Sequence, residues 1–554
     1  MSINTAGVQG QRPVDPLMSG EDAAEAEAEP KPAHPPFNLR SELWTMFAMG
    51  WPMVASFLCR LLMASTDTAF VGHLDNSTIG WQLQKPYSAE SYLAAGALTD
   101  MVVSILTVPP LAFNQVLNAL VGQALGSGNK KMAGTWLQLS IFFLAISYVP
   151  FLAIQYFYTG ELLHLLGFDD NVRELGNLFA KVSIVWPIPN GIYQCMRFYF
   201  QAQGISRPAM YNNIAFVFIN GLFNWIFVFG GPFQYEWCPL RWHGVGFVGA
   251  ALSISASRCL QPFTYWLYMF VWKRHHRETW PGMNLDFLEI GRVKRFLSQA
   301  LPYVGTLIFQ SVSGQVTTLL IAQLGAVAIA ASSAVQAAAQ VASQGTAVAL
   351  TAVGAVRVGY YLGAGDAHGA KMAMWIVLAT SLITGLITLF VVWPLSDPII
   401  GLVTDDDTVK PVAEALVAAT FVQCVVGAIV QVLTSGVLGG QGRTLVITLI
   451  SFGFELPTSI GGVAIMVLVL KWRMPDGLLN ITWVNAAIGA FEMFIVGVVV
   501  LCGDWEKYAR EALQRQEAAR AENAANEAAA AAPSAVEPLQ AVVPADADEQ
   551  APPP

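Results

Sequence analysis

The sequence contains little charge. Only 12% of its 554 residues are Asp, Glu, Lys or Arg, whereas 55% are hydrophobic and the mean hydropathy is +0.50. Soluble domains carry about 25% charged residues, so this composition argues against a soluble domain and predicts a protein embedded in a bilayer. The net charge of -9 points to no site, because much of the acid lies in the two tails.

The sequence also lacks the signatures of catalytic and metal-dependent proteins. Its six cysteines form no C-x-x-C pair and predict neither a disulfide framework nor a metal site. The seven histidines lie in loops or near segment ends, so no histidine cluster is expected within the membrane. No G-K-[ST] follows a glycine-rich loop, which argues against ATP-driven export by this chain. We therefore expect no enzyme, no metal and no cofactor beyond a coupling ion.

Long apolar segments dominate what is present. A helix needs roughly 20 mostly apolar residues to cross a bilayer, and about twelve segments meet this condition, which predicts an all-α membrane protein. Two prolines, Pro109 and Pro110, predict a kink or a break in the second segment. The segments centre near Phe57, Pro110, Ala145, Trp186, Phe218, Leu260, Ile308, Ala342, Leu382, Val422, Leu456 and Phe491.

Composition divides the chain into five regions. The predicted order is a disordered tail (1–43), an N-lobe of six spans (44–272), a linker (273–294), a C-lobe of six spans (295–503) and an Ala/Glu/Pro-rich tail (504–554). Basic residues are about twice as frequent on the side of both tails, which predicts cytoplasmic termini. The sequons at Asn76 and Asn480 fall on the opposite side, as does a polar insertion near 75–91.

One motif occurs twice. Residues 121–128 and 358–365 both read V-G-x-x-L-G-x-G, and a Gln-Gly pair follows each copy at nearly the same distance, at 203–204 and 441–442. Glycines four residues apart allow close helix packing. Two like halves of six spans each predict parallel repeats, an arrangement in which transporters place the substrate path between the lobes.

These motifs together resemble the multidrug and toxic compound extrusion (MATE) family, over about residues 44 to 503. The resemblance rests on Ala300-Leu301-Pro302, on 355–365, on 67–74 and 122–126, and on 246–251 and 436–442. It implies two six-helix bundles arranged as a V, alternating access, and export of organic, often cationic, solutes or xenobiotics against H⁺ or Na⁺. It also implies a monomer in the plasma or vacuolar membrane, with a small organic solute and the lipid bilayer as its partners and no nucleic acid.

Acidic residues inside spans are candidates for ion coupling, because burying an ionisable group is unfavourable unless it has a function. Asp67, in the first span, matches an acidic position of the family, although it could instead be solvated near the span end. Asp100 could face the N-lobe cavity or the membrane surface. Glu455 precedes Pro457 and could form a cation site or pair with a neighbouring helix, and Glu492 is a weaker candidate.

Amide side chains replace acids at other positions of the family pattern. An amide can hydrogen-bond a substrate but cannot titrate, so the resemblance leaves the identity of the coupling ion open. Some of these amides could simply join helices. The predicted substrate-cavity residues are Asn220, Asn224, Gln310, Gln315, Gln336 and Gln431, with Gln340 and Gln344 nearby.

Two other functions would require features of which the sequence shows little. A lipid-linked precursor flippase of related architecture would need a basic, lipid-sized groove, and few basic residues are expected within the spans. A membrane-embedded enzyme would need clustered His or Asp ligands in the spans, and the sequence contains no such cluster.

Overall fold

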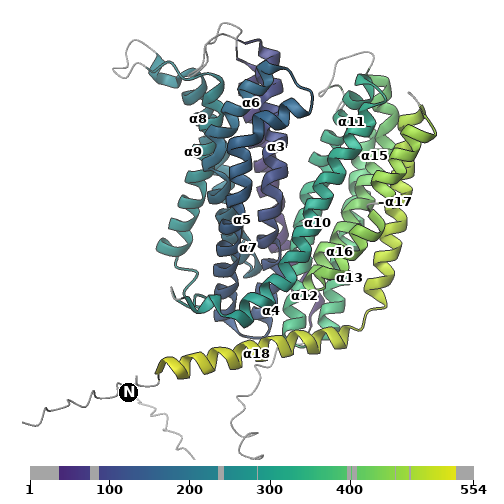
Figure 1. Cartoon of the computed structure of the whole chain (residues 1–554). Coiled ribbons are helices and arrows are strands. Elements are labelled where there is room, and N and C mark those ends of the chain that lie inside the picture. Colours follow the sequence, from purple (N-terminus) through teal and green to yellow (C-terminus); the bar gives the residue numbers. More distant parts are fainter. Residues whose placement is uncertain are drawn as a thin grey trace, which may run out of the picture.

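The computed structural model describes residues 37–74, 87–234, 242–282, 285–395, 401, 409–455, 457–472 and 476–531, and every regular element among them is helical. The helices form two bundles that stand side by side and lean apart at one end (Figure 1). We call the end where α2 begins and α18 lies the terminal face. Asn76 and most of the polar insertion near 75–91 lie outside the described residues.

The N-lobe contains six consecutive helical segments. Prolines inside α2, α3, α5 and α9 do not end these helices, and α3 continues into α4 after a single turn residue, Val116. The segments are α2 (Leu39–Gly72), α3 (Ala89–Gln115) with α4 (Leu117–Gly126), α5 (Lys130–Leu165), α6 (Asp170–Val182) with η1 (Ser183–Val185) and α7 (Pro187–Ala202), α8 (Arg207–Phe229), and α9 (Phe247–Trp266) with η3 (Leu267–Trp272); η2 (Gly231–Gln234) follows α8.

The C-lobe repeats this plan with more π-helical turns, which often occur at functional sites. Its segments are α10 (Ile290–Ala322), α11 (Ala326–Ala339) with η5 (Gln340–Gln344) and α12 (Gly345–Gly363), α13 (Ala367–Val392) with η6 (Trp393–Leu395), α15 (Lys410–Gln431) with η7 (Val432–Leu438), α16 (Thr444–Ile450) with η8 (Ser451–Glu455), η9 (Pro457–Gly462) and η10 (Ile465–Val469), and α17 (Asp476–Leu501).

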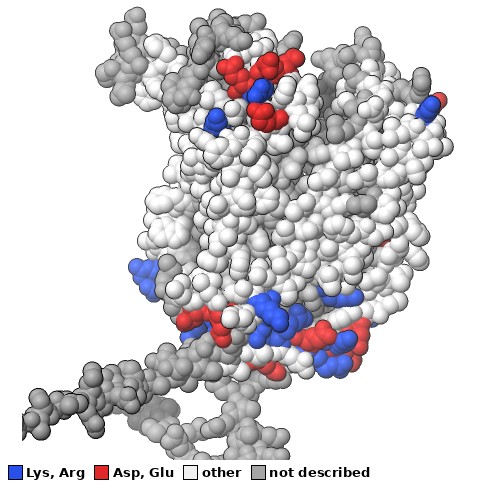
Figure 2. All heavy atoms as spheres, viewed as in Figure 1, with Lys and Arg blue, Asp and Glu red and all other residues white. Residues whose placement is uncertain are grey.

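The prediction of about twelve membrane-spanning segments is confirmed. Eight of the described helices are long and apolar enough to cross a bilayer on their own. The other four segments, containing α7, α9, α10 and α16, are more polar or are assembled from shorter helices. On the face shown in Figure 2, charged side chains gather at the two ends of the molecule and leave a broad, almost uncharged band between them. That band has the character expected of a lipid-facing surface.

The connection between the lobes packs against the N-lobe. The side-chain amide of Gln138 on α5 donates to the Gly282 carbonyl at 2.6 Å, and Lys130 pairs with Glu278 at 2.7 Å. The hydrogen bond from Lys130 lowers the pKa of Glu278. The connection includes a short 3-10 helix, η4 (Leu285–Leu288), and α10 begins at Ile290, within the predicted linker.

Two helices extend into the regions predicted as tails. Asn38 caps α2 by accepting hydrogen bonds from the backbone of Arg40 and Ser41. After α17, helix α18 (Trp505–Ala531) runs across the terminal face beneath both lobes (Figure 1). It packs on α12 and α13 and touches α4.

Candidate functional site

A cavity of about 1170 Å³ lies between the two lobes. Its N-lobe wall comes from α2, the end of α3, the start of α4, and α7, while α10, α11, α15 and α17 supply most of the C-lobe wall. The polar segments α7 and α10 therefore face the cavity. Such a volume is slightly above the range of about 300–1,000 Å³ that is usual for small-molecule sites.

The predicted amide residues fall into three groups. Gln310, Gln336 and Gln431 line the cavity, as do Gln340 and Gln344. Gln315 is partly exposed on α10 but is outside the cavity lining. Asn220 and Asn224 are buried within the N-lobe, where they contact Asp67 instead.

Asp67 lies at the centre of a buried polar cluster. The residue is 9% exposed, and one carboxylate oxygen accepts hydrogen bonds from the amide nitrogens of Asn220 and Asn224, both at 2.7 Å. Asn220 and Asn224 are one helical turn apart on α8, so both amides reach the same oxygen. The Ser253 hydroxyl donates to the Asn220 carbonyl at 3.5 Å and extends the cluster to α9.

The other predicted acids are separate from this cluster or only loosely associated with it. Asp100 is exposed on α3 and, like Asp67, interacts electrostatically with Arg258 on α9. Glu455 ends η8, and its side chain lies outside the described residues. Glu492 on α17 lines the cavity.

Two arginines in the cavity wall were missed from the sequence. Arg60 on α2 and Arg197 on α7 both line the cavity, and Arg197 is only 5% exposed. The signal was present for Arg60, which lies well inside a predicted span, as does Arg258, whereas Arg197 lies at the end of the span centred near Trp186. The cavity wall therefore contains basic residues, of which few were expected within the spans.

The two copies of the glycine motif meet at the terminal side of the cavity, where α4 crosses α12. A Cβ atom added to Gly122 would lie 2.7 Å from the Val356 carbonyl oxygen, and one added to Gly359 would lie 3.0 Å from the Ala119 carbonyl oxygen. When one repeat is aligned with the other, the contact of Gly122 with Val356 corresponds to the contact of Gly359 with Ala119. The crossing is thus pseudo-symmetric, like the self-complementary interface of a dimer.

The same relation holds one helical turn further on. A Cβ atom at Gly126 would collide with the Tyr360 carbonyl oxygen, and one at Gly363 would collide with the Gln123 carbonyl oxygen. The Gln123 side chain also donates to the Gly440 carbonyl at 3.0 Å, between the lobes. The motif is therefore a close helix crossing that joins the repeats at this end.

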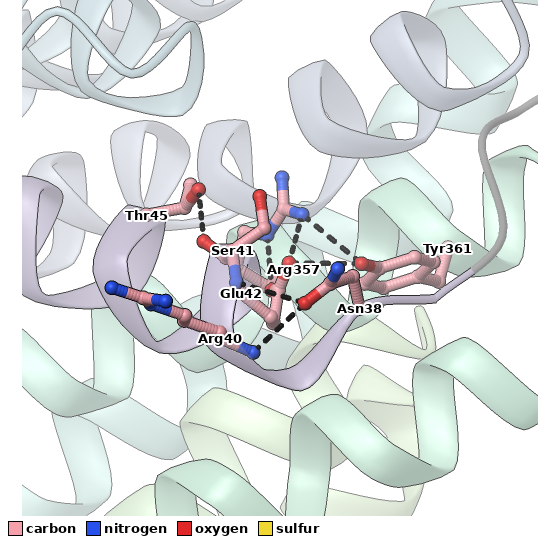
Figure 3. Close-up of polar contacts among 7 residues, drawn as sticks. All are labelled: Asn38, Arg40, Ser41, Glu42, Thr45, Arg357 and Tyr361. Atoms are coloured by element: carbon pink, nitrogen blue, oxygen red, sulfur yellow. Dashed lines mark hydrogen bonds and ion pairs between the residues drawn. The ribbon is translucent and has the colours of Figure 1, made fainter.

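An ion pair joins the lobes beyond the glycines. Figure 3 shows Glu42, in the first turn of α2, facing Arg357 and Tyr361 of α12. Arg357 donates from Nε and from one terminal nitrogen to the two Glu42 oxygens, at 2.6 and 2.5 Å. The Tyr361 hydroxyl donates to Glu42 at 2.8 Å, and Glu42 is 3% exposed. This bidentate ion pair and the glycine crossing close the terminal side of the cavity.

Comparison with known proteins gives a consistent result. The MatE family model matches residues 84–226 and 302–460. Multidrug and toxin extrusion protein 1 of Danio rerio is 24% identical over 87% of this chain and 75% of its own length. An uncharacterized transporter of Schizosaccharomyces pombe is 25% identical over 83% of this chain and 79% of its own. The crystal structure of the eukaryotic MATE transporter AtDTX14 superposes with a TM-score of 0.72, at 21% identity, over 86% of this chain and 99% of that one.

Proposed function

This chain belongs to the MatE family of multidrug and toxin extrusion transporters, and from that membership we propose that it is a secondary antiporter. In this proposal it exports small organic solutes in exchange for H⁺ or Na⁺ by alternating access. We propose further that it acts as a monomer in the plasma or vacuolar membrane, with both termini in the cytoplasm. The excess of basic residues on the terminal side supports that orientation.

The observation that carries the coupling role is the environment of Asp67. The carboxyl group is buried and is held by two neutral amides. Arg258 interacts with it electrostatically, but no cation of the described residues forms an ion pair with it. Its charge therefore depends mainly on whether a proton or a cation occupies the cluster. A site of this kind can exchange an ion when the surrounding helices move.

Alternating access is supported by the distribution of contacts between the lobes. The glycine crossing and the Glu42–Arg357 pair are both on the terminal side of the cavity. If the termini are cytoplasmic, the structure corresponds to an outward-facing state. Export then requires these contacts to separate, because the solute must enter from the cytoplasmic side.

The proposal is tested in proteoliposomes with an imposed pH or Na⁺ gradient. Two xanthene dyes serve as probes: rhodamine 6G is a cation and 6-carboxyfluorescein is an anion. We expect wild-type protein, but not Asp67→Asn, to accumulate at least one dye when the vesicle interior is acidic or rich in Na⁺. Asp169→Asn removes an exposed carboxylate outside the cluster and serves as the matched control.

A second measurement separates coupling from folding. Exchange of dye across the membrane without an ion gradient should persist in Asp67→Asn, because that variant retains the cavity. Normal gradient-driven accumulation by Asp67→Asn would refute the assignment of Asp67. Dye accumulation in wild type that responds to neither gradient would refute ion antiport.

One observation favours a second function, a flippase for lipid-linked precursors. The arginines at positions 60 and 197 give the N-lobe wall the positive charge that a phosphate headgroup would require. A flippase would move a fluorescent polyprenyl diphosphate between leaflets and would leave water-soluble dyes outside. Transport of the dyes without lipid movement would exclude this alternative.

A further inference from the structure

Two positive charges face the central cavity from two helices of the N-lobe, α2 and α7. Arg60 and Arg197 both line it, and they are close enough to each other to interact electrostatically. The third charged residue of the lining, Glu492, lies on the opposite wall and already has an interaction of its own. The N-lobe wall of the cavity is therefore positively charged.

Neither guanidinium has a hydrogen-bond or ion-pair partner within the part of the chain that the structure describes. The Nε atoms of both arginines are buried without an acceptor. Asp67 and Asp100, the predicted acids within the N-lobe spans, interact electrostatically with Arg258. The charges of Arg60 and Arg197 are thus not neutralised by the described part of the protein.

Structural roles alone do not explain this arrangement. Arg60 lies 5.7 Å from the centre of the Phe57 ring, and Arg197 lies 4.7 Å from that of Phe198. These ring contacts orient the guanidiniums, but they do not replace the hydration that each charge loses on burial. An arginine remains protonated in such a site, and two like charges side by side repel each other. A ligand of opposite charge would relieve both effects.

We propose that Arg60 and Arg197 form an oxyanion-binding subsite of the transport cavity, which receives the carboxylate, sulfonate or phosphate group of an organic anion. The inference rests on the proposed function only in taking this cavity as the substrate path. It assigns the chain an anionic substrate class in place of the cations expected from the family resemblance.

The chemistry of the wall suits such a group. A guanidinium presents parallel N–H donors that match the two oxygens of a carboxylate, or two oxygens of a phosphate. Asn114, Asn118 and Gln194 also line the cavity, and their side-chain amide oxygens are buried without hydrogen-bond partners. They would accept hydrogen bonds from hydroxyl or N–H groups on the rest of the solute.

Equilibrium binding to purified protein in lipid nanodiscs, without any ion gradient, tests the subsite. Fluorescence anisotropy is measured with 6-carboxyfluorescein and with rhodamine 6G. We expect wild-type protein to bind the anion at least tenfold more tightly than the cation. Arg197→Gln and Arg60→Gln should each weaken anion binding at least tenfold, whereas Arg197→Lys should retain most of it because it keeps the charge.

Arg207→Gln, which removes an exposed arginine at the start of α8, should bind like wild type. Thermal unfolding shows whether each variant is folded, and Arg60→Gln provides the test if Arg197→Gln is not folded. Tighter binding of the cation than of the anion by wild type would overturn the proposal. Equal weakening of the binding of both dyes by Arg197→Gln would also overturn it. Because this binding assay contains no ion gradient, its result stays valid even if the antiport proposal fails.

Competition distinguishes two sources of the oxyanion. Displacement of carboxyfluorescein by farnesyl diphosphate, but not by inorganic diphosphate, would assign the group to a polyprenyl lipid. Displacement by benzoate or by a sulfated phenol, with no effect of farnesyl diphosphate, would assign it to a soluble organic anion. No displacement by any of these oxyanions would overturn the subsite.

Discussion

Removal of the Glu42 carboxylate should shift the balance between the two access states. In the structure the Glu42 side chain is 4% exposed and that of Arg357 is 15% exposed, so Glu42→Gln leaves a largely buried guanidinium without its counter-ion. Loss of one partner of a buried pair costs about 3–5 kcal/mol. Since Arg357 is slightly exposed and glutamine still accepts one hydrogen bond, we expect about 2–3 kcal/mol here.

That cost applies only to the state in which the terminal face is closed. When the lobes separate at this face, water reaches both side chains and the substitution has little effect. A differential cost of about 2–3 kcal/mol changes the ratio of the two states by about 30-fold to 150-fold. Glu42→Gln should therefore favour the state that is open at the terminal face.

Pulsed electron spin resonance measures this shift directly. Spin labels are placed on exposed Lys131 of the N-lobe and Lys371 of the C-lobe, both near the terminal face, after replacement of the native cysteines. We expect a longer-distance population in Glu42→Gln and in Arg357→Gln. The exchanged pair, Glu42→Arg with Arg357→Glu, should recover much of the short distance. Unchanged distances in both folded single variants would show that the ion pair does not hold the lobes together.

Two further substitutions test packing at the same end of the molecule. Gly126→Ala places a Cβ against the Tyr360 backbone and should destabilise the closed crossing by about 1–3 kcal/mol. The same spin-label distances measure this effect. The control Gly497→Ala, whose Cβ would meet open space, should leave the distances unchanged. Phe296→Ala removes a fully buried ring that stacks on Phe113 and Phe143. It should reduce the free energy of unfolding by about 3–5 kcal/mol and lower the unfolding temperature. An unchanged unfolding temperature would show that the aromatic stack does not stabilise the lobe contact.

Most of the fold could be predicted from the sequence because its signals are local. An apolar segment of sufficient length spans the bilayer wherever it packs, and the repeated glycines indicate close helix contact without showing which helix is the partner. The observation that each copy of the motif packs on the other depends on tertiary structure. The structure adds the pairing of Gly122 with Val356 and of Gly359 with Ala119.

The site was less predictable because it depends on contacts between distant helices. The spacing of Asn220 and Asn224 placed both amides on one face of a helix, but their hydrogen bonds to Asp67 require α2 and α8 to be adjacent. Arg60 was missed because average hydropathy over a span conceals a single charge. Glu42 fell in the region predicted as a tail, since a polar first turn of a helix resembles the end of a loop.

The glycine crossing also has a genetic consequence. The group that faces Gly126 is the carbonyl of Tyr360, and the group that faces Gly363 is the carbonyl of Gln123. Every amino acid carries that carbonyl, so no replacement at position 360 or 123 can make room for a larger residue opposite. In a selection for second-site suppressors of Gly126→Ala, recovery should come from reversion to glycine or from changes that move a whole helix.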